Sequence, residues 1–208
     1  MNPAEARPRE GNQTRSAILQ AATQLFATQG FAATGLQQVA DAAGVARATP
    51  SYFFGSKEGL WKAVLEAQNQ LAARIVPVAF AQAGAQPDRA ALIGALVDAT
   101  LGFHEQHPEF LRLIQWSELQ GNGLIHEVPT HGQAVETAVH AVQHVLRGSA
   151  MQEEDVRHVV LSVLGACYAH LVYGRTLGLT LGLHTDVPAF LTERRAHLKR
   201  LLLATLGS

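Results

Sequence analysis

The stretch TGLQQVADAAGVARATPSYFF, residues 34–54, decides how this chain folds. It predicts a helix of about two turns that ends at Gly44, then a short turn, then a second short helix with polar and aromatic side chains. Thr34 followed by Gln37 has the form of a capping box, so we expect the first helix to begin there. Four residues recur at the spacing of a buried face: Leu36, Val39, Ala40 and Val45. This is the layout of a helix-turn-helix, although two small helices around a glycine turn also occur as plain packing units.

Pro50 lies inside the second of these helices. Proline has no backbone N–H, and an interior position costs a helix about 3 kcal/mol, whereas the first turn tolerates it. One solution makes Thr49 the N-cap and Pro50 the first helical residue, which leaves Arg47 and Ala48 on the turn. The alternative keeps a helix start at Ala46 with a distorted first turn.

The rest of the chain is helical in pattern. Apolar residues recur at intervals of three and four, and the alternation typical of strands is absent, so we expect an all-α fold of about nine helices. The expected helices cover residues 14–30, 34–44, 47–54, 56–82, 88–106, 108–119, 133–147, 154–181 and 187–206. Pro77 should bend the fourth of these near its end. Residues 1–13, which carry proline, glycine and charges, predict a flexible N-terminal arm.

The composition is that of an ordinary globular protein. The formal net charge of −1 does not by itself indicate a nucleic-acid partner. The single cysteine, Cys167, excludes an intrachain disulfide and fits a reducing compartment. The N-terminus lacks the apolar core of a secretory signal, and no uncharged apolar run reaches the length that spans a bilayer. We therefore expect a cytoplasmic protein with no membrane partner.

Residues 14–65 closely resemble the N-terminal domain of the TetR family of bacterial transcriptional regulators, without a gap. The matching elements are ILQAATQLFATQGF from Ile18, VADAAGV from Val39 and YFFGSKEGL from Tyr52. Beyond residue 65 only the all-helical architecture matches. The resemblance implies a three-helix DNA-binding domain over residues 14–65 and a helical ligand-binding and dimerisation domain over residues 66–208.

The resemblance also places the DNA contacts, because in the family the start of the second helix and the third helix touch DNA. The corresponding residues are Thr34, Gln37, Arg47, Ala48, Thr49, Ser51, Tyr52 and Lys57. Arg47 suits guanine O6 and N7, and Lys57, at a helix N-terminus, suits a phosphate. The family commonly has an apolar residue at Pro50, tyrosine at Ser51 and a polar aromatic at Phe53. The serine therefore removes one contact.

The last two expected helices, 154–181 and 187–206, are apolar on several faces. One face belongs to the core of the subunit, and another is free to form a four-helix bundle with a second copy. A two-fold dimer also suits DNA binding, since one short helix per subunit reads few bases. A large monomeric core is the alternative.

Candidate ligand-binding residues are aromatic and polar side chains interleaved on the middle helices, each of which could equally be plain core. They are Phe80, Phe103, His104, His107, Leu113, Trp116, Cys167, His170 and Tyr173. The excess of apolar residues predicts a hydrophobic or aromatic effector. His140 and His144, like His104 and His107, share a helix face. No carboxylate or cysteine accompanies either pair, so we expect no metal, and Cys167 is expected to be a structural thiol.

Catalytic motifs are absent: there is no phosphate-binding glycine loop, nucleophile elbow or carboxylate pair with a helical histidine motif. We expect no enzyme and no cofactor. The residues and the resemblance together predict a ligand-responsive transcriptional regulator, most simply a repressor. It would bind a pseudo-palindromic operator in double-stranded DNA as a homodimer and be released by its effector. The alternative is a helical ligand-binding protein, or a metal or redox sensor, with altered DNA reading.

Overall fold

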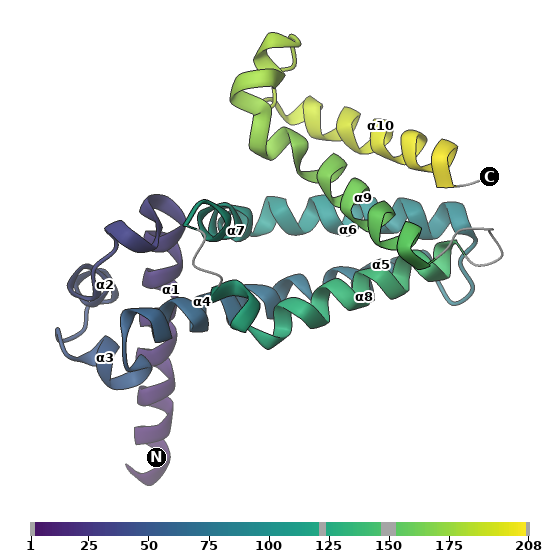
Figure 1. Cartoon of the computed structure of the whole chain (residues 1–208). Helices are drawn as coiled ribbons and strands as arrows, with labels where there is room; N and C mark the ends of the chain where they lie inside the picture. Colours follow the sequence, from purple (N-terminus) through teal and green to yellow (C-terminus); the bar gives the residue numbers. More distant parts are fainter. Residues whose placement is uncertain (1–2, 121–123, 147–152, 207–208) are drawn as a thin grey trace. The chain divides into compact units, whose positions relative to one another are not determined.

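A computed structural model of the chain describes residues 3–120, 124–146 and 153–206 (Figure 1). All regular elements in these ranges are helices and none is a strand, which confirms the all-α prediction. In order they are α1 (Pro3–Ala33), α2 (Leu36–Ala43), α3 (Thr49–Phe54), α4 (Lys57–Ala72), α5 (Ile75–Ala83), α6 (Arg89–Gln106), α7 (Pro108–Gln120), the 3-10 helix η1 (Leu124–Glu127), α8 (Pro129–Val145), α9 (Glu153–Tyr173), the π-helical segment η2 (Gly174–Gly178) and α10 (Pro188–Leu206).

Two elements differ most from their predicted bounds. The single helix expected over residues 56–82 is two helices, α4 and α5, separated by Ala73 and Arg74. In a continuous helix the ring of Pro77 would clash with the carbonyl of Ala73, so the break lies before it and the proline occupies the first turn of α5. Residues 3–13 form the first turns of α1 in place of the expected arm, with alanine, glutamate and arginine favouring the helix and Pro8 and Gly11 opposing it.

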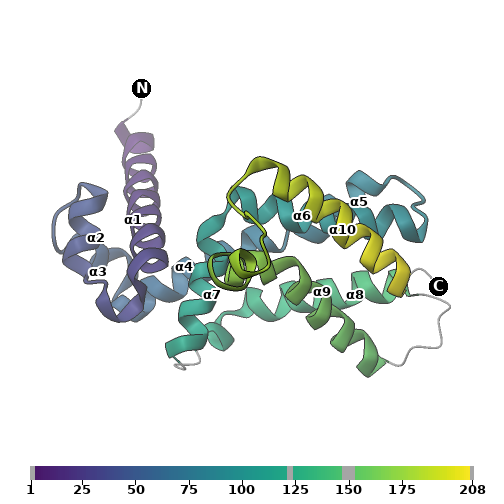
Figure 2. The ribbon, with the colours of Figure 1, turned by 90° about the horizontal axis from the view of Figure 1, so that it is seen from above.

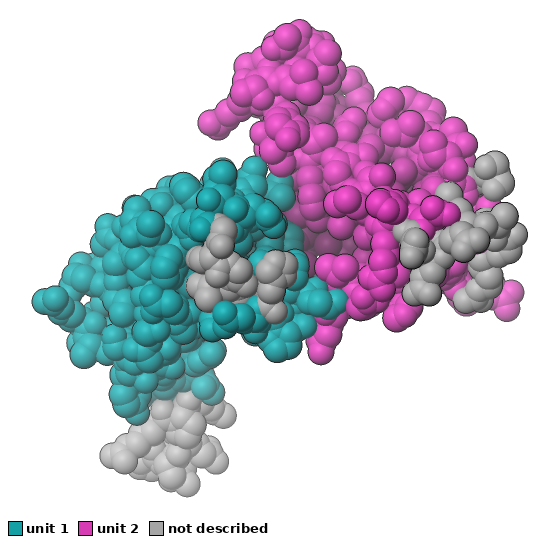
Figure 3. Space-filling model, in the orientation of Figure 1, with its two compact units in different colours: residues 1–71, 107–132 teal, residues 72–106, 133–208 magenta. Residues whose placement is uncertain are grey.

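The chain divides into two compact units, coloured separately in Figure 3. Unit 1 comprises residues 1–71 and 107–132, and unit 2 comprises residues 72–106 and 133–208. Helix α7 therefore belongs with the N-terminal helices, although it lies well beyond residue 65, where the resemblance to the DNA-binding domain ends.

The core of unit 1 joins helices α1, α2, α4 and α7. The ring of Phe26 meets that of Trp61 edge-on, with 5.0 Å between the centroids, and both side chains are fully buried. The other buried members of this core are Ile18, Ala22, Ala27, Val39, Leu60, Val64, Leu65, Leu113, Ile125 and Val128. The apolar spacing along the first two helices is thus the buried face that the sequence predicted.

The core of unit 2 is built by α6, α8, α9 and α10. Helix α10 packs along α6, and α5 lies on another side of α6 (Figure 2). Ion pairs reinforce the contact between α10 and α6. Arg195 on α10 donates to Glu105 on α6 at 2.7 Å, and Lys199 on α10 pairs with Asp98 on α6. Cys167 and Leu198 are the most deeply buried residues of this core.

Candidate functional site

The entry into the helix-turn-helix differs from the predicted capping box. Thr34 is 1% exposed, and its hydroxyl donates to the carbonyl of Gly30 at 2.7 Å. The N-cap of α2 is Gly35, whose N–H donates to Oε1 of Gln38 at 2.8 Å, one residue later than the predicted pair of Thr34 and Gln37. The prediction was wrong because the hydroxyl of Thr34 is committed to the end of α1. The side chain of Thr34 is thus buried at the end of α1.

The turn and the start of α3 settle the question raised by the proline. Gly44 ends α2 in the left-handed conformation, with φ 66° and ψ 34°, as expected for a helix stop. Helix α3 begins at Thr49 with Ala48 as its N-cap, so Pro50 is the second helical residue, where no helical partner for an N–H is lost. The start lies between the two alternatives, and Arg47 is on the turn.

The side chains of this turn and of α3 form what we call the reading surface: Arg47, Ala48, Thr49, Ser51 and Tyr52. All are exposed except Thr49, which is half-buried, and Tyr52 is 84% exposed. Beneath them Pro50 is buried, and Phe53 packs against the core of unit 1. The apolar residues of α3 thus anchor it, while its polar residues face solvent.

Besides Thr34, two predicted DNA-binding residues lie outside the reading surface. Gln37 is exposed on α2, and its amide donates to Oδ1 of Asp41 at 2.6 Å. Lys57 is the first residue of α4, and its ammonium donates to the carbonyl of Ala32 at 3.2 Å and lies 4.4 Å from the ring centroid of Phe31. The charge of Lys57 is therefore held against the end of α1.

The nine predicted ligand-binding residues are divided between the units. His107, Leu113 and Trp116 belong to unit 1, and the other six belong to unit 2. Leu113 is fully buried in the core of unit 1, whereas Tyr173 is 55% exposed. Of the nine, Phe80 lines the groove described next.

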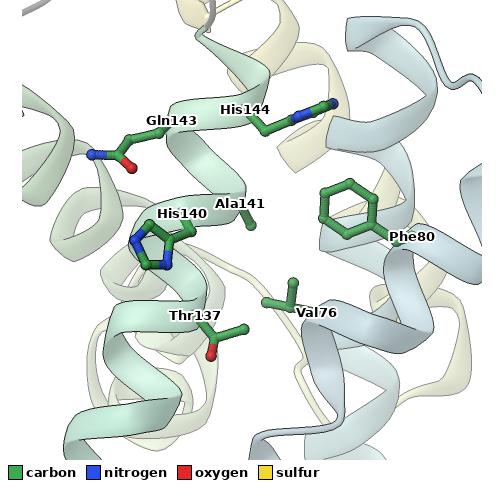
Figure 4. A pocket seen from close by; sticks show the side chains of 7 residues that line it. All are labelled: Val76, Phe80, Thr137, His140, Ala141, Gln143 and His144. Atoms are coloured by element: carbon green, nitrogen blue, oxygen red, sulfur yellow. The ribbon is translucent and has the colours of Figure 1, made fainter.

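This groove, with a volume of about 440 Å³, lies between α5 and α8 (Figure 4). Its lining is Val76, Phe80, Thr137, His140, Ala141, Gln143 and His144. The ring of Phe80 meets the imidazole of His144 edge-on, with 5.5 Å between the centroids. This lining contains no charged carboxylate, ammonium or guanidinium group. The i, i+4 spacing of the two histidines was visible in the sequence, but their partners on α5 were not.

Four other predicted ligand-binding residues belong to unit 2: Phe103, His104, Cys167 and His170. Phe103 and His104 are buried, and the imidazole of His104 meets the ring of Tyr168 with 4.6 Å between the centroids. Burial raises the pKa of the Cys167 thiol to about 11, so the thiolate that a redox sensor needs is disfavoured. Burial, reinforced by the charge of Arg194, lowers the pKa of His170. Within the described ranges, no group of three or more histidine, cysteine or acidic side chains could hold a metal ion.

Apolar side chains are exposed along α9, η2 and the segment that leads to α10. They are Leu161, Leu171, Val172, Tyr173, Leu177, Leu179, Leu181, Leu183 and Val187, with Leu201 on α10. Residues 155–178 are long and apolar enough to cross a membrane by length and composition, which the sequence analysis did not expect. The same segment supplies Val156, Val160 and Cys167 to the core of unit 2.

The comparisons with known proteins agree with this architecture. A family model described as bacterial regulatory proteins, tetR family, matches residues 18–64. A second, described as tetracyclin repressor-like, C-terminal domain, matches residues 90–201, which is more than half of the chain. A TetR-like transcriptional regulator from Rhodococcus sp. RHA1 has the same fold, with a TM-score of 0.67 over 94% of this chain and 96% of that chain at 18% identity.

Curated relatives match over shorter lengths. The HTH-type transcriptional regulator SrpR of Pseudomonas putida is 30% identical over 146 residues, which is 70% of this chain and 65% of SrpR. The HTH-type transcriptional repressor SCO4008 of Streptomyces coelicolor is 30% identical over 112 residues, which is 54% of this chain and 53% of that protein. The chain thus spans between half and two thirds of the length of these relatives.

The proteins described by these family models are transcriptional regulators and not enzymes. They bind DNA and generally act as dimers with small-molecule effectors. The helix-turn-helix of unit 1, the two family models and the shared fold all lead to one conclusion. This chain belongs to the tetR family of bacterial regulatory proteins.

Proposed function

We propose that this chain is a repressor that binds a pseudo-palindromic operator as a homodimer and is released by a small aromatic or hydrophobic effector. The observation that carries the proposal is the reading surface, whose polar side chains are exposed while Pro50 anchors α3 from below. The repressor role is supported by the name of SCO4008. The protein would act in the cytoplasm, where the chromosome lies.

Four members of the reading surface have a defined role in this proposal. Arg47 donates two hydrogen bonds to guanine O6 and N7, the commonest specific contact in a major groove. The methyl group of Thr49 touches a thymine methyl, and the hydroxyls of Ser51 and Tyr52 reach phosphates. Gln37 adds a backbone contact from α2. Lys57 contributes its charge near a phosphate while it holds the end of α1.

A dimer follows from two independent arguments. One short reading helix specifies few bases, so two half-sites about one helical turn apart, roughly 34 Å, are needed for a specific operator. The exposed apolar side chains of α9, η2 and α10 are also too many for the surface of a monomer. We propose that a second copy covers them through a four-helix bundle, which also accounts for the apolar character of residues 155–178.

The groove between α5 and α8 is the proposed effector site. Val76, Ala141 and the ring of Phe80 supply apolar contacts, and Thr137 and His140 supply hydrogen-bonding groups. Its volume is within the usual range for small-molecule sites, and its uncharged lining suits a small neutral aromatic molecule with polar substituents. An effector that binds better to a conformer of low operator affinity releases the DNA.

Operator binding is tested first by selecting duplex DNA that the protein binds. The wild-type protein is incubated with a pool of random-sequence duplex DNA, and we expect it to enrich an inverted repeat. Arg47→Ala should then weaken binding to the selected duplex by about 5- to 150-fold in an anisotropy titration, which corresponds to roughly 1–3 kcal/mol. Arg112→Ala is the matched control, because Arg112 is also exposed in unit 1 but lies on α7. Equal effects of the two substitutions would contradict the assignment of the reading surface.

The dimer is tested by sedimentation velocity. Leu161→Glu and Leu177→Glu place charges on the exposed apolar side chains of α9 and η2, and we expect both to yield monomers. Leu119→Glu is the control, since Leu119 is 78% exposed on α7, away from those helices in the sequence. A wild-type protein that remains monomeric at micromolar concentration would refute the proposed use of α9 and α10.

A further inference from the structure

The end of α1 contains a joint, residues 30–34, that connects it to α2. Gly30 interrupts the helix with φ 79° and ψ 173°, a conformation available essentially to glycine alone. The hydroxyl of Thr34 closes the joint by donating to the carbonyl of Gly30 at 2.7 Å. The first helical residue of α2, Leu36, follows after a single N-cap residue. The conformation of this joint therefore sets the direction in which α2 leaves α1.

Helix α7 holds the joint from one side through Trp116. The indole lies directly on Gly30, so a Cβ at that position would lie 2.8 Å from Cε3 and 2.9 Å from Cδ2 of the ring. The indole N–H donates to the carbonyl of Ala27 at 3.3 Å. A second contact joins the same helices, since the amide of Gln24 donates to Oε1 of Glu109 at 2.7 Å. We call these contacts of Trp116 and Glu109 with α1 the clasp.

Helix α4 holds the joint through Lys57, which contacts Phe31 and Ala32 as described above. Helix α4 also reaches unit 2, since its last residue, Ala72, belongs to that unit. Helix α6 of unit 2 ends at Gln106 and α7 begins at Pro108, so a single residue separates unit 2 from the helix that carries the clasp.

We propose that Trp116 is a positioning residue for DNA reading: through the clasp it fixes the joint, and thereby α2 and α3, in the operator-binding geometry. Loosening of the clasp would be the step by which a change in α6 lowers operator affinity. This inference rests on the proposed operator binding. Because such coupling is reciprocal, operator binding must in turn tighten the clasp. If Trp116 served only the stability of unit 1, its accessibility to a quencher would not change when DNA binds.

The first measurement uses the fluorescence of Trp116 itself. The chain contains two tryptophans, and Trp61→Phe leaves Trp116 as the only one. This substitution keeps an aromatic ring beside Phe26 and removes a buried indole N–H that has no hydrogen-bond partner among the described residues, so we expect the variant to fold. Addition of the selected duplex should lower the quenching of Trp116 by acrylamide. Quenching that is unchanged at saturating duplex would overturn the proposal.

The second measurement is the affinity of a Trp116 variant for the selected duplex, with Trp61 left unchanged. Trp116→Phe keeps a ring against Gly30 but removes the hydrogen bond to Ala27, and we expect it to weaken binding to the selected duplex by about 2- to 30-fold, the usual range for residues that act through coupling. Leu119→Ala, on the same helix but exposed, is the matched control and should bind like the wild type. If Trp116→Phe binds the selected duplex with wild-type affinity, the proposed role of Trp116 is overturned, while the proposed function is untouched. A wild-type protein that selects no duplex would instead overturn the proposed function.

Discussion

Substitution of Gly30 by alanine should destabilise unit 1 more than the same substitution at Gly44. Two costs coincide at this position. With φ 79° and ψ 173°, the backbone is in a region that costs a residue with a side chain about 1–3 kcal/mol. The new Cβ would also lie 2.8 Å from the indole of Trp116, closer than carbon atoms approach without a shift.

The size of the second cost depends on how far Trp116 can move. Forcing a methyl group into a packed contact typically costs about 1–3 kcal/mol, and the half-buried indole has room for part of the required shift. The total loss in the free energy of unfolding should therefore be about 2–4 kcal/mol. Gly44→Ala is the matched control: φ is also positive, at 66°, but no atom lies within 4 Å of the added Cβ. It should cost about 1–2 kcal/mol from backbone strain alone.

Urea unfolding followed by tryptophan fluorescence measures this difference. Both tryptophans, Trp61 and Trp116, lie in unit 1, so the signal reports the unfolding of that unit. For an m-value of about 1–3 kcal/mol per molar urea, a loss of about 3 kcal/mol lowers the midpoint by roughly 1–3 M. If Gly30→Ala lowers it no more than Gly44→Ala does, the close contact with Trp116 contributes nothing and the reasoning is refuted. In a Trp116→Ala background, Gly30→Ala should cost only the backbone part, because the contact with the indole is gone.

Three further predictions concern unit 2. Gly102→Ala on α6, where no atom lies within 4 Å of the added Cβ, should raise the free energy of unfolding by about 0.5–1 kcal/mol in denaturation followed by circular dichroism. Iodoacetamide at pH 8.5 should modify Cys167 only after unfolding. Because burial raises the pKa of its thiol from 9.0 to about 11, the protonated thiol contributes stability that is intact below pH 9 and is lost as the pH rises to 11. Cys167→Ala should abolish this loss. Burial lowers the pKa of His170 below 6.5, so the stability contributed by its neutral form is present above that pH and is lost as the pH falls. His170→Gln should therefore flatten the decline in the free energy of unfolding as the pH falls below about 6.5. An unchanged decline would mean that other groups cause it.

The DNA-binding motif could be predicted from the sequence because its signals are local. Gly44 stops α2, and the spacing of Val39 and its apolar neighbours defines the buried face within a few turns. Pro50 restricted α3 to two starts, and the structure begins the helix at Thr49, between them. Each of these features depends on backbone conformation or helical periodicity within about ten residues, so no knowledge of distant packing was needed.

The capping of α2 and the place of α7 were decided by tertiary structure. The sequence pattern allowed a capping box at Thr34, but the hydroxyl of that residue is taken by the joint, which Trp116 holds from far along the chain. The groove likewise combines Phe80 and His144 from helices that are distant in sequence. The sequence by itself determined the all-α fold, the family and the turn and short helix that carry the reading surface. Which helices share a unit, and which side chains face one another, were decided only by packing, because such contacts leave no periodic signal in either partner.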